Sequence, residues 1–219
     1  WGKITYKNIS ESDYAEKAGI KILGAIPIPP SPTDLSTQML QFKNMNPDFG
    51  YIIGVPNDSI PALRDSAKIG IPGSKFIGIN WNTHPVVIKT AGAAAEGFMA
   101  SQSNSPWGAD NVVMDEINEF MKTNEIPTKD EFYWRGWFNT RTIVEAIRRL
   151  LEKDPKAPED IKAFRQKVKE ALENLKYNPG KGLPEIDYSN HQGYTSMKFV
   201  QVQNGAFKDI TGLVQPKHK

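Results

Sequence analysis

Aromatic rings and carboxamides occur where several predicted strands and helices of this sequence meet their loops. These side chains are Trp1, Asn57, Asn80, Trp81, Tyr133, Trp134 and Trp137. An aromatic wall with a few polar anchors is typical of a pocket for a small organic ligand. Any one of these rings is more often part of a core, but Trp81 lies in a polar loop where core packing is less common. The set therefore indicates binding of a small molecule.

The sequence contains no arrangement of residues that is typical of catalysis or metal binding. It has no phosphate loop, no nucleophile elbow and no dinucleotide fingerprint. There is no cysteine, and none of the histidines (His84, His191 and His218) has a second ligand at metal spacing. Asp34 and Asp58 fall at predicted helix starts, where capping explains them better than acid–base chemistry. We therefore expect no catalytic residue, no metal and no cofactor.

A strand–helix–strand unit would position the candidate residues. Residues 49–55 form a short apolar run, typical of a strand buried on both faces, and residues 75–79 form a second one. Apolar residues between the two runs recur at helical spacing, which predicts a right-handed crossover between parallel strands. In open α/β sheets, ligands bind beyond the carboxyl ends of the strands. Those ends are residues 55–58 and 80–84.

The flanking sequence continues this alternation of strands and helices. Residues 3–18 have rough helical spacing before Gly19, and residues 20–28 predict a strand. A helix that starts near Asp34 and a further strand over residues 97–101 complete the pattern. Alternating strands and helices favour a doubly wound parallel sheet.

A polar break at residues 101–108 ends this alternation, and three amphipathic helices follow. Their predicted buried faces include Phe120, Ile143 and Ile161 among other apolar residues. The last part of the chain has two alternating runs around Asn204-Gly205, which is a strong signal for a β-hairpin.

The composition is that of an ordinary globular chain. The 219 residues are 39% hydrophobic and 24% charged, and the net charge is +2. Cationic and anionic residues are interleaved without a stripe of one sign, so we expect no nucleic-acid partner. No apolar run is long enough to span a membrane. The chain opens on Trp1-Gly2 without an initiator Met or leader, from which we expect that an upstream part of the protein is missing.

A series of short motifs runs in order along nearly the whole chain. The motifs are Trp1-Gly2, Thr33-Asp34-Leu35-Ser36, Asn46-Pro47-Asp48, Gly54, Leu63-Arg64, Gly70-Ile71, Phe76-Ile77-Gly78, Ala94-Ala95-Glu96-Gly97, residues 133–138 and Phe199-Val200-Gln201-Val202. In this ordered series the chain resembles the periplasmic solute-binding proteins of the branched-chain amino acid type, which serve ABC importers.

The resemblance implies an α/β type I periplasmic-binding-protein fold, with two doubly wound parallel-sheet lobes and a ligand cleft between them. Residues 1–103 and 197–219 would form the second lobe, and residues 108–190 the helices that complete the first lobe. The crossover hinges would lie near residues 101–107 and 192–196. The first lobe would be incomplete, because the N-terminal segment that the family carries is absent from this sequence.

The resemblance also assigns ligand-contacting positions. Trp1 matches an aromatic residue that packs on the ligand, and Val55 falls where many members place a tyrosine. Asn80 falls where amino-acid binders carry a carboxylate that pairs with the ligand's ammonium group. An amide leaves that charge unneutralised, which is costly in a desolvated cleft, and Asp58 is better explained as a helix cap. A hydrophobic or aromatic carboxylate, or an amide, would fit Trp1, Asn80 and Trp81 at least as well.

The function that the resemblance implies is a non-enzymatic one. The protein would capture a small hydrophobic ligand, close around it and present it to the membrane permease subunits of an ABC importer, in the periplasm or as a lipid-anchored extracellular protein. Two alternatives stay open. A ligand-sensing receptor or regulator of the same fold would need a fused signalling domain. An enzyme on a flavodoxin-like sheet would need a phosphate loop or a catalytic pair, and the sequence contains neither.

Overall fold

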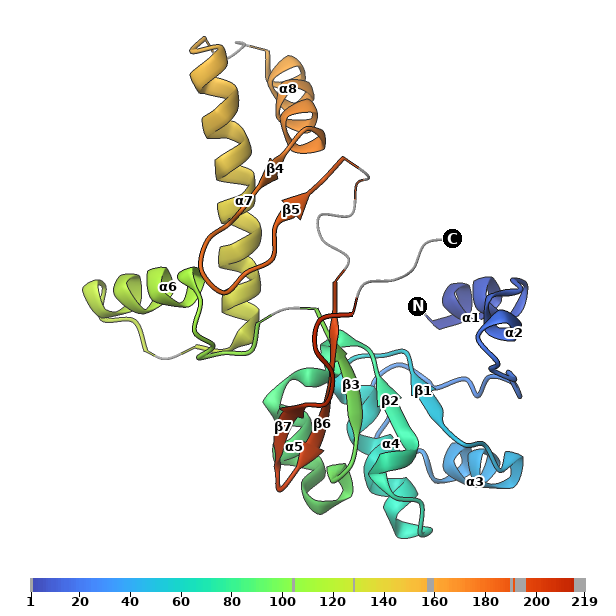
Figure 1. The fold of residues 1–219 in the computed structure, drawn as a ribbon. Helices are drawn as coiled ribbons and strands as arrows, with labels where there is room; N and C mark the ends of the chain where they lie inside the picture. The colour runs from blue at the N-terminus through green and yellow to red at the C-terminus, as the bar shows by residue number, and fades with distance from the viewer. Residues whose placement is uncertain are drawn as a thin grey trace. The chain divides into compact units, whose positions relative to one another are not determined.

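The computed structural model describes residues 2–103, 105–127, 129–156, 160–189, 191 and 196–214. The chain folds into two compact units (Figure 1). The first unit consists of residues 1–103 and 197–214, and the second of residues 104–196 with residues 215–219. The first unit is therefore built from two separate stretches of chain.

The first unit is organised around a five-stranded sheet in the order β1-β2-β3-β6-β7. Its strands are β1 (Gly50–Ile52), β2 (Phe76–Gly78), β3 (Met99–Gln102), β6 (Lys198–Gln203) and β7 (Ala206–Asp209). The first three are parallel, whereas β6 runs antiparallel to β3 and β7 antiparallel to β6. The predicted hairpin is confirmed, because Asn204 and Gly205 turn between β6 and β7 with φ of 55° and 73°, as a type I′ turn requires.

Three helices precede the sheet: α1 (Gly2–Ser10), α2 (Tyr14–Lys17) and α3 (Ser36–Met45). The parallel strands are connected by α4 (Pro56–Lys68) and α5 (Pro85–Ala91), with short 3-10 turns η1 (Gly73–Lys75), η2 (Asn80–Thr83) and η3 (Gly92–Ala95). Proline begins both α4 and α5, where its missing N–H costs no hydrogen bond. The cap expected of Asp58 is confirmed, since the Val55 N–H donates to Asp58 Oδ2 at 2.8 Å. α4 packs against both α3 and α5.

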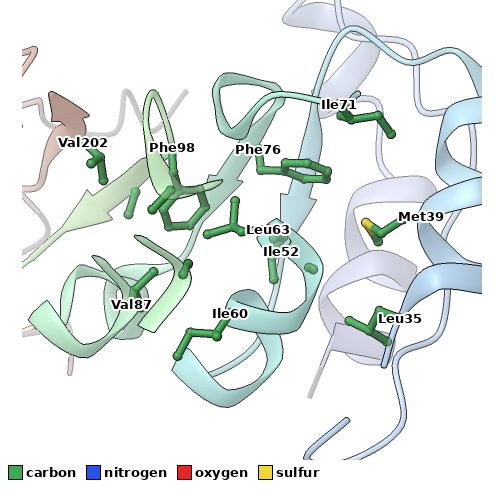
Figure 2. Close-up of a cluster of buried hydrophobic side chains, with 14 of the residues drawn as sticks. Leu35, Met39, Ile52, Ile60, Leu63, Ile71, Phe76, Val87, Phe98 and Val202 are labelled. Carbon is green, nitrogen blue, oxygen red and sulfur yellow. The ribbon is translucent and has the colours of Figure 1, made fainter. Parts of the chain in front are cut away.

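The core of the first unit lies between this sheet and its helices. Figure 2 shows Leu63, Phe76 and Phe98 at its centre, with Leu35 and Met39 on one side and Val202 on the other. Gly78 allows this packing, because a Cβ at that position would lie only 2.7 Å from Phe98 Cζ.

The prediction of a strand over residues 20–28 is wrong for the chain as the structure describes it. This segment has no strand assignment, although Ile22, Ile26 and Ile28 are more buried than their immediate neighbours, and Ile26 and Ile28 pack against the core. The alternation that predicts a strand is thus present, but a strand also needs a hydrogen-bonded neighbour. In the described part of the chain no segment pairs with residues 20–28.

The second unit is mainly helical. It contains α6 (Val112–Thr123), α7 (Glu131–Lys153) and α8 (Ile161–Glu173), and a small sheet of β4 (Lys176–Tyr177) and β5 (Ile186–Asp187). The three predicted helices are confirmed, but their buried faces are smaller than expected. Phe120, Ile143 and Ile161 are 39%, 45% and 57% exposed, and no residue of α8 is fully buried. These helices thus carry more apolar surface than the other described elements of the unit cover.

A buried carboxylate joins α4 to the start of α3. Asp65 is 2% exposed, and its Oδ2 accepts the Leu35 N–H at 2.7 Å while its Oδ1 accepts from Lys68 Nζ at 2.6 Å. Burial by itself raises the pKa of Asp65, but the hydrogen bonds from Lys68 and Leu35 and the charge of Lys68 outweigh it and lower the pKa.

This pairing predicts an acid-sensitive contribution to stability. A carboxyl whose pKa is lowered by folding stabilises the folded state above its unfolded pKa of about 4, and the contribution is lost as pH falls through the lower folded value. We expect the free energy of unfolding to fall more steeply from about pH 5 to about pH 3 in the wild type than in Asp65→Asn. Urea unfolding at several pH values measures this. The exposed control Asp48→Asn should follow the wild type, and equal slopes for wild type and Asp65→Asn would contradict the assignment.

Candidate ligand-binding site

The carboxyl ends of β1, β2 and β3 meet at one edge of the sheet. The strands are parallel and in register, with Ile52 opposite Gly78 and Gly78 opposite Ala100. Asn80 Nδ2 donates to Ser103 Oγ at 3.0 Å, so side chains that follow β2 and β3 contact each other directly. We call this part of the first unit, residues 53–58, 79–84 and 103, the carboxyl edge. The sequence predicts ligand binding at this same edge.

A fully buried amide holds the carboxyl edge together. Asn82 is 0% exposed, accepts a hydrogen bond from Ser59 Oγ at 2.6 Å and donates to the Gly54 carbonyl at 3.1 Å. It therefore ties η2 to the first turns of α4 and to the end of β1. Asn82 and Ser103 could not be predicted from the sequence, because an Asn or Ser in a polar loop carries no signal of the distant partner that it bonds.

Four predicted ligand contacts belong to the carboxyl edge. Val55, Asn80 and Trp81 are half-buried there, and Asn57 is exposed on the first turn of α4. Trp81 lies in the short turn η2, which ends at the helix start of α5, where His84 Nδ1 accepts the Val86 N–H at 3.1 Å. These four contacts comprise one aromatic ring, one aliphatic side chain and two amides.

The start of α1 lies next to the same edge. A Cβ built on Gly2 would lie 3.5 Å from Ile53 Cβ, which places the first turn of α1 beside the residue that follows β1. Trp1, the aromatic residue expected to pack on the ligand, lies outside the described residues.

The remaining predicted contacts, Tyr133 and Trp134, belong to α7 in the second unit. Trp134 is 2% exposed, stacks on Phe138 with 5.0 Å between ring centroids, and donates from Nε1 to Asn111 Oδ1 at 3.3 Å. The structure gives Trp134 a place in the core of that unit. Tyr133 is half-buried, with its ring 6.2 Å from that of Trp137. A ligand contact by either residue stays a prediction.

Two open pockets lie away from the carboxyl edge. One of about 430 Å³ is lined by the end of α4 and by Pro72, Gly73, Ala93, Ala94 and Glu96, which precede β2 and β3 at the opposite end of the sheet. The other, of about 330 Å³, lies in the second unit between α7 and Tyr177. Its lining carboxylate Glu145 is paired: hydrogen bonds from Arg148 and Arg149 lower the pKa of Glu145 to about 2.

The described residues contain no group of three His, Asp or Glu side chains that could hold a metal ion. Among the described helices, none has the length and apolar character needed to cross a membrane.

Comparison with known families identifies the fold. The periplasmic binding protein family matches residues 10–206, which is most of the chain. The chain belongs to this family. The predicted membership and the predicted type I periplasmic-binding-protein fold are thereby confirmed, and the parallel strands β1, β2 and β3 agree with both. No curated protein sequence matches the chain.

Solved structures of the family resemble the chain in fold. A branched-chain amino acid ABC transporter protein from Thermus thermophilus with bound valine has a TM-score of 0.77 and 22% identity over 93% of this chain. A leucine-binding protein from Thermotoga maritima gives 0.70 and 21% over 92%. A fatty acid ABC transporter substrate-binding protein from Thermomonospora curvata gives 0.72 and 17% over 93%. The chain spans 55%, 54% and 52% of these proteins, so it corresponds to about half of their length.

Proposed function

We propose that this chain is part of the solute-binding component of an ABC importer, and that it binds a small hydrophobic ligand without chemical conversion. The observation that carries the proposal is the carboxyl edge, where Val55, Asn57, Asn80 and Trp81 gather at the parallel strand ends of a periplasmic-binding-protein fold. Ligands of such sheets bind at this position. The related solved structures are named as substrate-binding or transporter proteins, which favours transport over catalysis.

In this proposal the first unit is the second lobe of the protein, and residues 108–190 complete the first lobe. Ligand bridges the two lobes and stabilises a closed state, which the permease subunits recognise. The hinges lie near residues 101–107 and 192–196, of which residues 104 and 192–195 fall outside the described part of the chain. The protein acts in the periplasm or, lipid-anchored, at the cell exterior.

The proposal includes a further segment of the same protein that completes the first unit. β1 pairs with β2, and among the described residues nothing pairs with its other side. Tyr51 in this strand and Phe49 just before it are 53% and 56% exposed. An unpaired strand with exposed aromatic side chains is a place where another strand adds. We place that strand between β1 and residues 20–28, whose alternating burial fits a strand that lacks its neighbour.

Hydrogen exchange tests this placement. In the protein encoded by the complete gene, we expect slow exchange for the amides of Tyr51, Ile53 and residues 22–28, because a paired amide exchanges only when the pair opens and Gly50 and Ile52 already face β2. In residues 1–219 alone the same amides should exchange quickly, while those of β2 stay protected in both. Fast exchange in the complete protein would contradict the added strand. Protection that rises with the concentration of residues 1–219 would assign the edge to a second copy instead.

A thermal-shift screen of the complete protein tests solute binding. A ligand that binds only the folded state stabilises it by mass action and so raises the melting temperature. At a free ligand concentration of 100 times Kd, the added stability is about 2.7 kcal/mol. The panel contains branched-chain amino acids, aromatic acids and short amides. We expect at least one of these compounds to raise the melting temperature in a saturable way. A panel without any shift would count against a site for small hydrophobic solutes.

A further inference from the structure

The charge of the carboxyl edge restricts the ligand that it accepts. The residues that follow β1, β2 and β3 (53–58, 79–84 and 103) contain a single acidic side chain, Asp58. At the same end of the sheet, across the antiparallel pair of β3 and β6, Asp209 is paired with Lys198 at 2.8 Å. Among the described residues that form the carboxyl edge, only Asp58 could therefore supply the counter-charge of a ligand cation.

Asp58 is already used by the fold. Its Oδ2 accepts the Val55 N–H at 2.8 Å as part of the cap of α4. The carboxylate is also packed against the turn, because a Cβ on Gly54 would lie 2.5 Å from the same Oδ2 atom. Turning this group toward a ligand would give up the cap at the strand–helix junction that positions the edge. Asp58 is thus a structural carboxylate.

The polar groups at the ends of β2 and β3 are neutral. Asn80 Nδ2 donates to Ser103 Oγ at 3.0 Å, and both side chains are half-buried. Amide and hydroxyl groups form hydrogen bonds with a carboxylate or an amide, since each has both donor and acceptor capacity. They do not neutralise an ammonium group, which keeps most of its desolvation cost when it is buried without a counter-charge. A carboxylate differs because the N-terminus of α4, at Val55 and Pro56, gives the edge the positive end of a helix dipole, which favours an anion over a cation. Val55 and Trp81 supply apolar surface beside the polar groups.

We infer that the ligand group bound at the carboxyl edge carries no ammonium, and that the solute is a hydrophobic carboxylic acid or amide rather than an α-amino acid. This inference rests on the proposed solute-binding function and narrows it to one chemical class. The Asn80–Ser103 pair orients the polar end of the solute, and Trp81 covers its apolar part.

Matched ligands with and without the ammonium group test the inference. Calorimetry of the complete protein compares L-leucine with 4-methylpentanoic acid and 4-methylpentanamide, and L-phenylalanine with 3-phenylpropanoic acid and 3-phenylpropanamide. We expect an acid or amide to bind at least about tenfold more tightly than its matching amino acid, a difference of about 1.4 kcal/mol.

The variant Asn80→Asp should shift this ratio of affinities at least about tenfold toward the amino acid, because it supplies a counter-charge. Asn44→Asp, an exposed position on α3, adds the same charge elsewhere and should leave the ratio unchanged.

Each outcome separates this inference from the function on which it rests. If leucine or phenylalanine binds the wild type more tightly than its matching acid and amide, the inference is overturned while solute binding stands. If none of the six compounds binds, the proposed function fails together with the inference. The comparison of amino acids with acids and amides on the wild-type protein tests the inference even where Asn80→Asp does not fold.

Discussion

Replacing Asn82 with alanine will lower the free energy of unfolding by about 2–4 kcal/mol. The side chain is fully buried and bonds both Ser59 Oγ and the Gly54 carbonyl. Alanine removes both hydrogen bonds and leaves a small cavity. The buried Gly54 carbonyl then has lost the donor that Asn82 Nδ2 gives it. Ser59 Oγ keeps a second acceptor in the Pro56 carbonyl at 3.2 Å, which limits the loss. Urea unfolding followed by circular dichroism measures the difference.

Asn57→Ala is the matched control for this change. Asn57 belongs to the same edge and has the same side chain, but it is exposed on α4. We expect its removal to change the free energy of unfolding by no more than about 0.5 kcal/mol and to weaken ligand binding instead. A similar loss of stability in both variants would show that Asn82 has no special role in holding the edge.

Asn111→Ala should destabilise the second unit by a comparable amount, about 2–4 kcal/mol. Asn111 is 1% exposed, and its Oδ1 accepts the Met114 N–H at 3.0 Å as the N-cap of α6. The same oxygen accepts from Nε1 of the buried Trp134 at 3.3 Å. Alanine therefore removes a helix cap and leaves an indole N–H buried without this partner. Thermal or urea unfolding of the protein measures the loss.

Two further variants separate these effects from a general sensitivity of α6. Asn111→Asp keeps an acceptor for both N–H groups and should lose less stability than alanine does. Asn124→Ala removes an exposed amide that bonds the Phe120 carbonyl at the other end of α6, and should cost about 0.5 kcal/mol or less. Equal destabilisation by Asn111→Ala and Asn124→Ala would contradict the cap and the Trp134 contact.

The sequence was sufficient to locate the carboxyl edge, because local signals define it. The apolar runs before Val55 and Asn80, and the proline and capping carboxylate that follow the first run, depend only on neighbours in the chain. The hairpin at Asn204-Gly205 was predictable for the same reason, since its turn type follows from two residues.

Features that depend on distant partners were not predictable. The role of Asn82 needs Ser59 and Gly54, which lie 23 and 28 residues earlier in the chain. The burial of Trp134 depends on how α6 and α7 pack, which the residues next to it in the chain do not show. Residues 20–28 have the alternation of a strand, but pairing is a property of the sheet and not of the segment. Phe120 and Ile143 follow the helical pattern, yet the described part of the second unit offers too few elements to cover them.

Small-angle X-ray scattering of the complete protein, with and without its tightest ligand, tests the central claim most directly. If ligand is held between two lobes and closes them, saturating ligand will decrease the radius of gyration, and the decrease will follow the binding curve measured by calorimetry. An unchanged radius of gyration at proven saturation would contradict hinge closure, and with it the proposal that this chain forms one wall of a closing solute-binding cleft.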